Sequence, residues 1–219
     1  MICYAENNDN SSFIIISKKD GSITKEIFVP FKEKKYLSQS KIDGDKIQSI
    51  RPAGVFRLTP FNGNWMLLEL GSDTVYELLP NYRTVPLIVR TPPIQSMKSE
   101  IMLVIRLITD RYYFFDTVIN EYNFAKDKGF DRKSLMYDKK TKTLSEFVVY
   151  NDDFSTKKGT YINVSTPINQ EIATWSSIQA HRLIESLNNG ELKNGKLKEI
   201  ASRLDEEDNP VIQLLKHKK

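Results

Sequence analysis

The sequence predicts an all-β fold of mainly antiparallel strands, with one short helical segment before a C-terminal strand. Apolar runs of strand length recur every roughly 8–12 residues, the spacing of strand-and-turn units. Glycine, proline, asparagine and aspartate fill the gaps between these runs, as turns require. A helical period appears only after residue 174. A chain of 219 residues can bury one sizeable core or two small ones.

The first strands are expected at residues 13–17 and 23–29. The turn between them, residues 18–21, ends in a glycine that accepts a positive φ angle. Pro30 then ends the pairing because proline has no N–H to donate to a neighbouring strand. The polar stretch 32–46 that follows is interpreted as a connection.

Two further sets of strands follow. The second set is expected at residues 54–58, 64–70, 74–79 and 85–90, and the third at 102–108, 112–119, 134–137 and 145–150. Residues 65–68 and 112–115 are apolar at consecutive positions, so we expect both faces of these strands to be covered. Sheets that stack on other sheets, as in sandwiches and propellers, are covered in this way.

The C-terminal region predicts two helices and a last strand. Ser176 and Gln179 fit a capping box, and Leu197 begins a second amphipathic segment. Pro210 forces an extended chain before the final apolar run. We therefore expect a single domain over 1–219, with a helical insertion at about 176–205 and a closing strand at about 210–216.

Composition and charge argue against several classes of protein. The 32 basic and 28 acidic residues nearly balance, and the basic clusters are short, so we expect no nucleic-acid partner. No apolar run reaches the ~18–20 residues that a membrane helix needs, so no transmembrane segment is expected. Residues 1–6 lack the basic and apolar regions of a signal peptide.

The sequence predicts no catalytic residues, no metal site and no cofactor. Cys3, His181 and His217 are too few and too scattered for a zinc site or a Ser/His/Asp triad. No glycine-rich phosphate loop is present. A pair of carboxylates for glycoside cleavage stays open as an alternative, because several acids lie in or beside predicted strands.

Candidate ligand-binding residues are chosen by the chemistry of their side chains. Aromatic rings stack on flat ligands, arginines donate hydrogen bonds, and one acidic residue lies in a predicted strand. They are Arg57, Trp65, Glu69, Arg90, Arg106, Arg111 and Tyr113. Further aromatic residues suited to a sugar- or peptide-binding surface are Tyr76, Tyr82, Tyr112 and Trp175. Aromatic residues in strands also fill cores, so burial decides between the two interpretations.

Four segments together resemble a known family. They are 71–78 (GSDTVYEL), 109–115 (TDRYYFF), 137–141 (YDKKT) and 207–212 (EDNPVI). In this order they resemble the six-bladed β-propeller family of secreted lipoproteins found in Bacteroides-type bacteria. The resemblance runs from about residue 13 to the end and matches only the C-terminal half of the family.

The resemblance implies a partial β-propeller of about three four-stranded blades, located in the periplasm or at the cell surface. It implies a non-enzymatic module that binds a glycan, a peptide or another cell-envelope protein at the axial face. A homodimer through open blade edges is a further expectation. The alternatives are a carbohydrate-active hydrolase or lyase on the same scaffold, and a truncated fragment without independent function.

Overall fold

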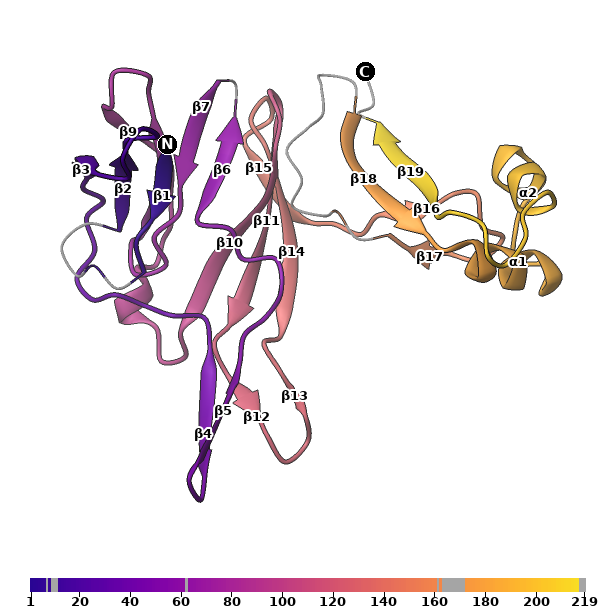
Figure 1. The fold of residues 1–219 in the computed structure, drawn as a ribbon, viewed down its shortest axis with the longest axis horizontal. Helices are drawn as coiled ribbons and strands as arrows, with labels where there is room; N and C mark the ends of the chain where they lie inside the picture. The colour runs from indigo at the N-terminus through magenta and orange to yellow at the C-terminus, as the bar shows by residue number, and fades with distance from the viewer. Residues whose placement is uncertain (7, 9–11, 62, 161, 163–171, 217–219) are drawn as a thin grey trace. The chain divides into compact units, whose positions relative to one another are not determined.

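The computed structural model describes residues 1–6, 8, 12–61, 63–160, 162 and 172–216. Antiparallel strands dominate these residues and two short helices lie near the C-terminus, which confirms the all-β prediction (Figure 1). By its contacts the chain forms two compact units. The first comprises Met1–Ile105 and Phe114–Leu135, and the second comprises Arg106–Tyr113 and Met136–Lys219. The expected single domain over 1–219 stays a prediction.

Two antiparallel sheets build the start of the first unit. One has the order β1-β2-β3, with β1 at Ile2–Tyr4, β2 at Phe13–Ile16 and β3 at Ile23–Ile27. The other has the order β6-β7-β8-β9, with β6 at Leu58–Phe61, β7 at Asn64–Leu67, β8 at Thr74–Leu78 and β9 at Thr84–Val89. The second sheet is therefore a four-stranded meander, as the turn spacing predicts.

The prediction of a strand at residues 54–58 is wrong, because β6 begins only at Leu58. Gly54 has φ 76°, which lies outside the β region and delays the strand. Pro60 is accepted within β6 because β6 is an edge strand of its sheet.

The two sheets share one hydrophobic core. Phe13 and Ile27 from the first sheet, with Val29 just beyond it, pack with Leu67 and Leu78 from the second. Burying each such side chain contributes roughly 1.5–3 kcal/mol. Residues 66–68 are buried, as predicted from their consecutive apolar character. Trp65 is the exception, since it stays exposed.

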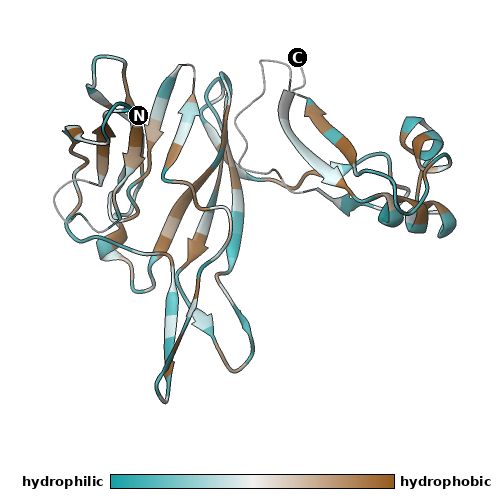
Figure 2. Ribbon diagram, viewed as in Figure 1, coloured by the Kyte–Doolittle hydropathy of each residue, from teal (hydrophilic) through white to brown (hydrophobic). Residues whose placement is uncertain are grey.

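A hairpin interrupts the stretch interpreted as a polar connection. It consists of β4 (Gln39–Asp43) and β5 (Lys46–Ile50), which pair around the turn at Gly44. Most of its residues are exposed and hydrophilic (Figure 2). Gln39 Nε2 donates a hydrogen bond to the carbonyl oxygen of Asn120 at 2.7 Å, which anchors the start of the hairpin.

A second four-stranded sheet has the order β10-β11-β14-β15, which confirms a third set of strands, although its last strand, expected at residues 145–150, lies at Thr143–Glu146. Its strands are β10 at Ile101–Ile108, β11 at Tyr112–Ile119, β14 at Arg132–Asp138 and β15 at Thr143–Glu146. The short strands β12 (Tyr122–Asn123) and β13 (Lys128–Gly129) are inserted after β11, and a 3-10 turn, η1 (Ile94–Ser96), precedes β10. Hydrophobic colour runs along β10 and β11 (Figure 2), and Met102 and Val104 in β10 are fully buried.

The C-terminal part of the second unit combines short strands with the helices. These elements are β16 (Tyr150–Asn151), β17 (Lys158–Gly159), β18 (Ile172–Ile178), α1 (Ala180–Asn188), α2 (Lys196–Ala201) and β19 (Val211–Lys216). β19 returns past both helices and pairs antiparallel with β18, which confirms the closing strand. Leu197 packs on a core that contains Leu183 and Ala201, which confirms the apolar stripe of the second helix.

The capping box expected at Ser176 is wrong. Ser176 lies inside β18 opposite Gln213, and its hydroxyl donates to Gln213 Oε1 at 3.2 Å. α1 begins at Ala180, so its N-cap is Gln179, three residues after the predicted cap, and Gln179 makes no side-chain capping hydrogen bond. Strand pairing with the distant β19 therefore overrides the local capping signal.

Candidate ligand-binding site

A pocket of about 240 Å³ opens on the first unit. Strands β1 and β2 contribute one side, and β7, the end of β8 and the β8–β9 loop contribute the other. The lining residues are Met1, Ile2, Ile15, Gly63, Asn64, Trp65, Leu78, Leu79, Pro80 and Tyr82. Among these lining residues, Tyr82 carries an ionisable side chain and Met1 carries the N-terminal ammonium, which donates to the Ile16 carbonyl oxygen at 2.7 Å.

Two aromatic side chains at this pocket are exposed. Trp65 is 37% exposed and Tyr82 is 47% exposed, although large aromatic residues contribute most when they are buried. Trp65 lies in β7 opposite Pro60 on one neighbour and Leu78 on the other. The strand thus fixes the backbone that presents the indole, and solvent reaches the ring.

A polar pair joins the neighbouring strands β7 and β8 beside Trp65. Asn64 Nδ2 donates a hydrogen bond to Glu77 Oε1 at 2.6 Å. Only the amide nitrogen can donate to a carboxylate, so this contact fixes the orientation of the amide. Asn64 and Glu77 are the strand neighbours of the paired residues Trp65 and Leu78, so their side chains meet on the opposite face of the sheet from Trp65.

The structure brings Arg57 and Glu69 together around Tyr4, within the first unit. Tyr4 Oη donates to Glu69 Oε2 at 3.2 Å, and the Arg57 guanidinium lies 5.1 Å from the Tyr4 ring centroid. Glu69 is fully buried and also accepts the Gly71 N–H at 3.3 Å. Burial raises the pKa of Tyr4 strongly, and burial lowers the pKa of Arg57. This cluster fastens β1 to the neighbouring sheet.

Arg90 and Arg106 lie outside both the pocket lining and the Tyr4 cluster. Arg90 Nε lies 3.9 Å from Asp73 Oδ1, and the same carboxylate oxygen accepts the Ile94 N–H at 2.6 Å. Burial lowers the pKa of Arg90. Arg106 is 2% exposed within β10. The ligand-binding roles of both arginines stay predictions.

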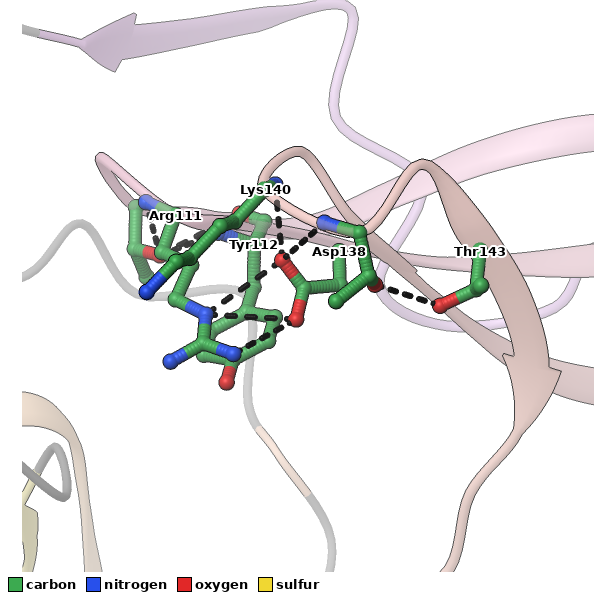
Figure 3. A network of polar contacts seen from close by, with 7 residues as sticks. Arg111, Tyr112, Asp138, Lys140 and Thr143 are labelled. Carbon is green, nitrogen blue, oxygen red and sulfur yellow. Dashed lines mark hydrogen bonds and ion pairs between the residues drawn. The ribbon is translucent and has the colours of Figure 1, made fainter.

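Arg111 and Tyr113 lie in the second unit, where a polar network surrounds Asp138 (Figure 3). Arg111 Nη2 donates to Asp138 Oδ2 at 2.7 Å, and its Nε also faces this carboxylate. The hydrogen bond from Arg111 lowers the pKa of Asp138 to about 2. Tyr113 stacks on Tyr137 with ring centroids 6.0 Å apart. The network joins the β10–β11 turn to the β14–β15 turn.

Of the seven predicted binding residues, only Trp65 lines the pocket. Tyr82, one of the further aromatic candidates, joins it there. Sequence reasoning missed Asn64, because its contact with Glu77 exists only once β7 and β8 are paired. Among the described residues, no three His, Cys, Asp or Glu side chains gather to hold a metal ion. No helix in that part of the chain has the length and apolar character to cross a membrane.

Neither the protein-family models nor the curated proteins match this chain. Among solved structures it is similar in fold to a "Putative exported protein" from Bacteroides fragilis NCTC 9343, with a TM-score of 0.52 and 13% sequence identity. The match covers 99% of this chain and 60% of that one, so this chain spans about three fifths of the neighbour's length. The likeness establishes a shared fold.

Proposed function

We propose that this protein is an extracytoplasmic, non-enzymatic binding module of the six-bladed β-propeller type, and that its ligand binds at the Trp65 pocket. Two four-stranded antiparallel meanders, β6–β9 and β10-β11-β14-β15, support the propeller assignment, since such a sheet is the unit of a blade. The fold-level likeness to an exported protein supports a location outside the cytoplasm. A glycan and a peptide are the ligand classes that suit exposed aromatic rings.

The exposed indole of Trp65 is the observation that carries the proposal. A strand side chain that packed in the core would be buried like its neighbours Met66 and Leu67. Trp65 instead lines a concave surface together with Tyr82 and Asn64. Binding sites are usually concave and mostly apolar, with a few placed polar groups. The described pocket lining holds no carboxylate, which favours binding over the two-carboxylate chemistry of a hydrolase.

The two tryptophans allow a direct test. Trp175→Phe leaves Trp65 as the only indole, so its fluorescence reports the pocket alone. This variant is screened on an array of neutral and acidic glycans and proline-rich peptides, and each hit is titrated. We expect at least one array member to change the Trp65 emission in a saturable way.

Trp65→Ala should weaken binding of the same hit at least tenfold on the array. Trp175→Ala is the matched control, because Trp175 is 45% exposed and lies in the second unit. Its binding should equal that of the unmodified protein. An array without hits, or a hit that Trp65→Ala binds unchanged, refutes the proposed site.

A further inference from the structure

Tyr82 occupies a strained backbone position at the rim of the pocket. Its φ angle is 63°, in the left-handed region that bulky side chains avoid. The peptide N–H of Leu79 donates to the carbonyl oxygen of Arg83, and the N–H of Tyr82 donates to that of Leu79, both at 2.9 Å. Residues 80–82 thus form a three-residue hairpin loop, whose left-handed position is usually occupied by glycine.

The other non-glycine residues with positive φ among those described have local explanations. Phe130 is 7% exposed and packs against Tyr122, so its side chain belongs to a core. Asp127 is a type of residue that tolerates this conformation. Lys142 lies in an exposed turn. Tyr82 differs from all three because it combines the strained backbone with an exposed aromatic ring at a pocket.

The contacts of the Tyr82 ring with the rest of the protein do not explain why a tyrosine occupies this backbone position. Lys25 Nζ lies 5.0 Å from the Tyr82 ring centroid, and Lys25 is itself exposed on β3. Exposed cation–π contacts are weak. Strained residues that the fold does not need tend to mark functional sites.

We infer that Tyr82 is held in this conformation to bind a pyranose ring of a neutral glycan together with Trp65. This inference rests on the proposed function and names its ligand class. The pocket, at about 240 Å³, is smaller than the ~300–1,000 Å³ of sites for drug-sized ligands, so it suits one ring of a longer chain. The aromatic faces of Trp65 and Tyr82, which both line the pocket, can cover the C–H face of a sugar ring.

Neutral sugars are favoured over acidic ligands and peptides for two reasons. The cations at the pocket are engaged within the fold, since the Met1 ammonium donates a hydrogen bond to the Ile16 carbonyl oxygen at 2.7 Å and Lys25 Nζ lies over the Tyr82 ring. A peptide bound as an added strand needs a row of backbone donors and acceptors. The pocket instead presents side chains from four strands and a loop.

The test uses the full chain and the probes cellohexaose, xylohexaose, mannohexaose and chitohexaose, titrated by calorimetry. Tyr82→Asn puts a residue that tolerates positive φ at the strained position. We expect its melting temperature to rise by roughly 2–8 °C. Its affinity for the bound hexaose should fall at least tenfold, and Tyr82→Phe should retain the affinity of the unmodified protein.

Lys142→Asn is the matched control, since it makes the same backbone change in the second unit. It should raise the melting temperature and leave hexaose binding unchanged. If Tyr82→Asn binds normally, or melts at a lower temperature, the role of Tyr82 is refuted. In that case the proposed function stands as long as Trp65→Ala still loses binding. Binding of proline-rich peptides with no response to any hexaose overturns the ligand class alone, and no response to any probe overturns both proposals.

Discussion

Glu69→Gln should destabilise the first unit strongly, although it changes only one atom of the side chain. The Glu69 carboxylate is fully buried and accepts hydrogen bonds from Tyr4 Oη and the Gly71 N–H. A glutamine keeps one acceptor oxygen and places an NH₂ group where the second oxygen lies. One buried donor then loses its partner, at a cost of about 1–3 kcal/mol.

The substitution also removes a negative charge near the guanidinium of Arg57, which has a buried Nη1 without a hydrogen-bond acceptor. Leaving a buried charge uncompensated costs about 3–5 kcal/mol when both partners are fully buried. Arg57 is partly exposed, so we expect the loss of this charge to cost less than that range. The expected loss in the free energy of unfolding is about 3 kcal/mol in total.

Urea unfolding of the Trp175→Phe protein, followed by Trp65 fluorescence, measures this loss in the first unit alone. With a denaturant slope of about 1–3 kcal/mol/M, the midpoint should fall by roughly 1–3 M. Glu26→Gln is the control, because Glu26 is an exposed carboxylate on β3 of the same unit. A Glu69→Gln midpoint equal to that of Glu26→Gln would refute the idea that the Tyr4–Glu69–Arg57 cluster holds β1 in place.

Three further predictions concern other parts of the chain. In a carboxyl NMR titration, Asp138 should titrate near 2, and Arg111→Gln should move its pKa towards the ordinary value of 3.8. Because folding lowers this pKa, Asp138 stabilises the fold above pH 3.8, and the contribution disappears as the pH falls towards 2. Leu183→Ala should lower the free energy of unfolding by about 2–5 kcal/mol, since Leu183 is fully buried beside α2. Urea unfolding followed by Trp175 fluorescence measures this loss, and an unchanged midpoint would contradict the packing of Leu183. Hexaose affinity should change less than about twofold between 0.05 and 1 M NaCl, because a neutral sugar has no charge for salt to screen. A steep loss of affinity in calorimetry would contradict binding through aromatic stacking.

Most strands of the second and third sets were predictable because their signals are local. Turn residues separate β7 from β8 and β8 from β9, and each strand carries its own apolar run. The hairpin β4–β5 was not predictable by the same reasoning. Its residues are mostly polar and exposed, and the contact of Gln39 with Asn120 joins positions 81 residues apart.

The capping error has the same origin. Ser176 carries a valid local signal for a helix start, and its pairing with Gln213 on β19 decides the outcome instead. Only the fold brings those two segments together.

The candidate site shows the same limit of sequence-based prediction. Trp65 was predicted to bind ligand, but its apolar neighbours also predicted burial, and the sequence could not separate the two because the choice depends on what covers each face of β7.

Charge explains why most of the predicted binding residues lie away from the pocket. Arginine was chosen as a ligand donor, yet Arg90 faces Asp73 and Arg111 faces Asp138, so each joins two segments of the fold. Arg57 serves the same purpose beside Tyr4. An arginine in an all-β protein with long turns is therefore as well suited to holding loops as to holding ligands. The pocket differs from these clusters because it offers two exposed rings among mostly apolar residues. A search for charged residues would pass over such a surface, whereas a search for exposed aromatic residues on rigid strands would find it.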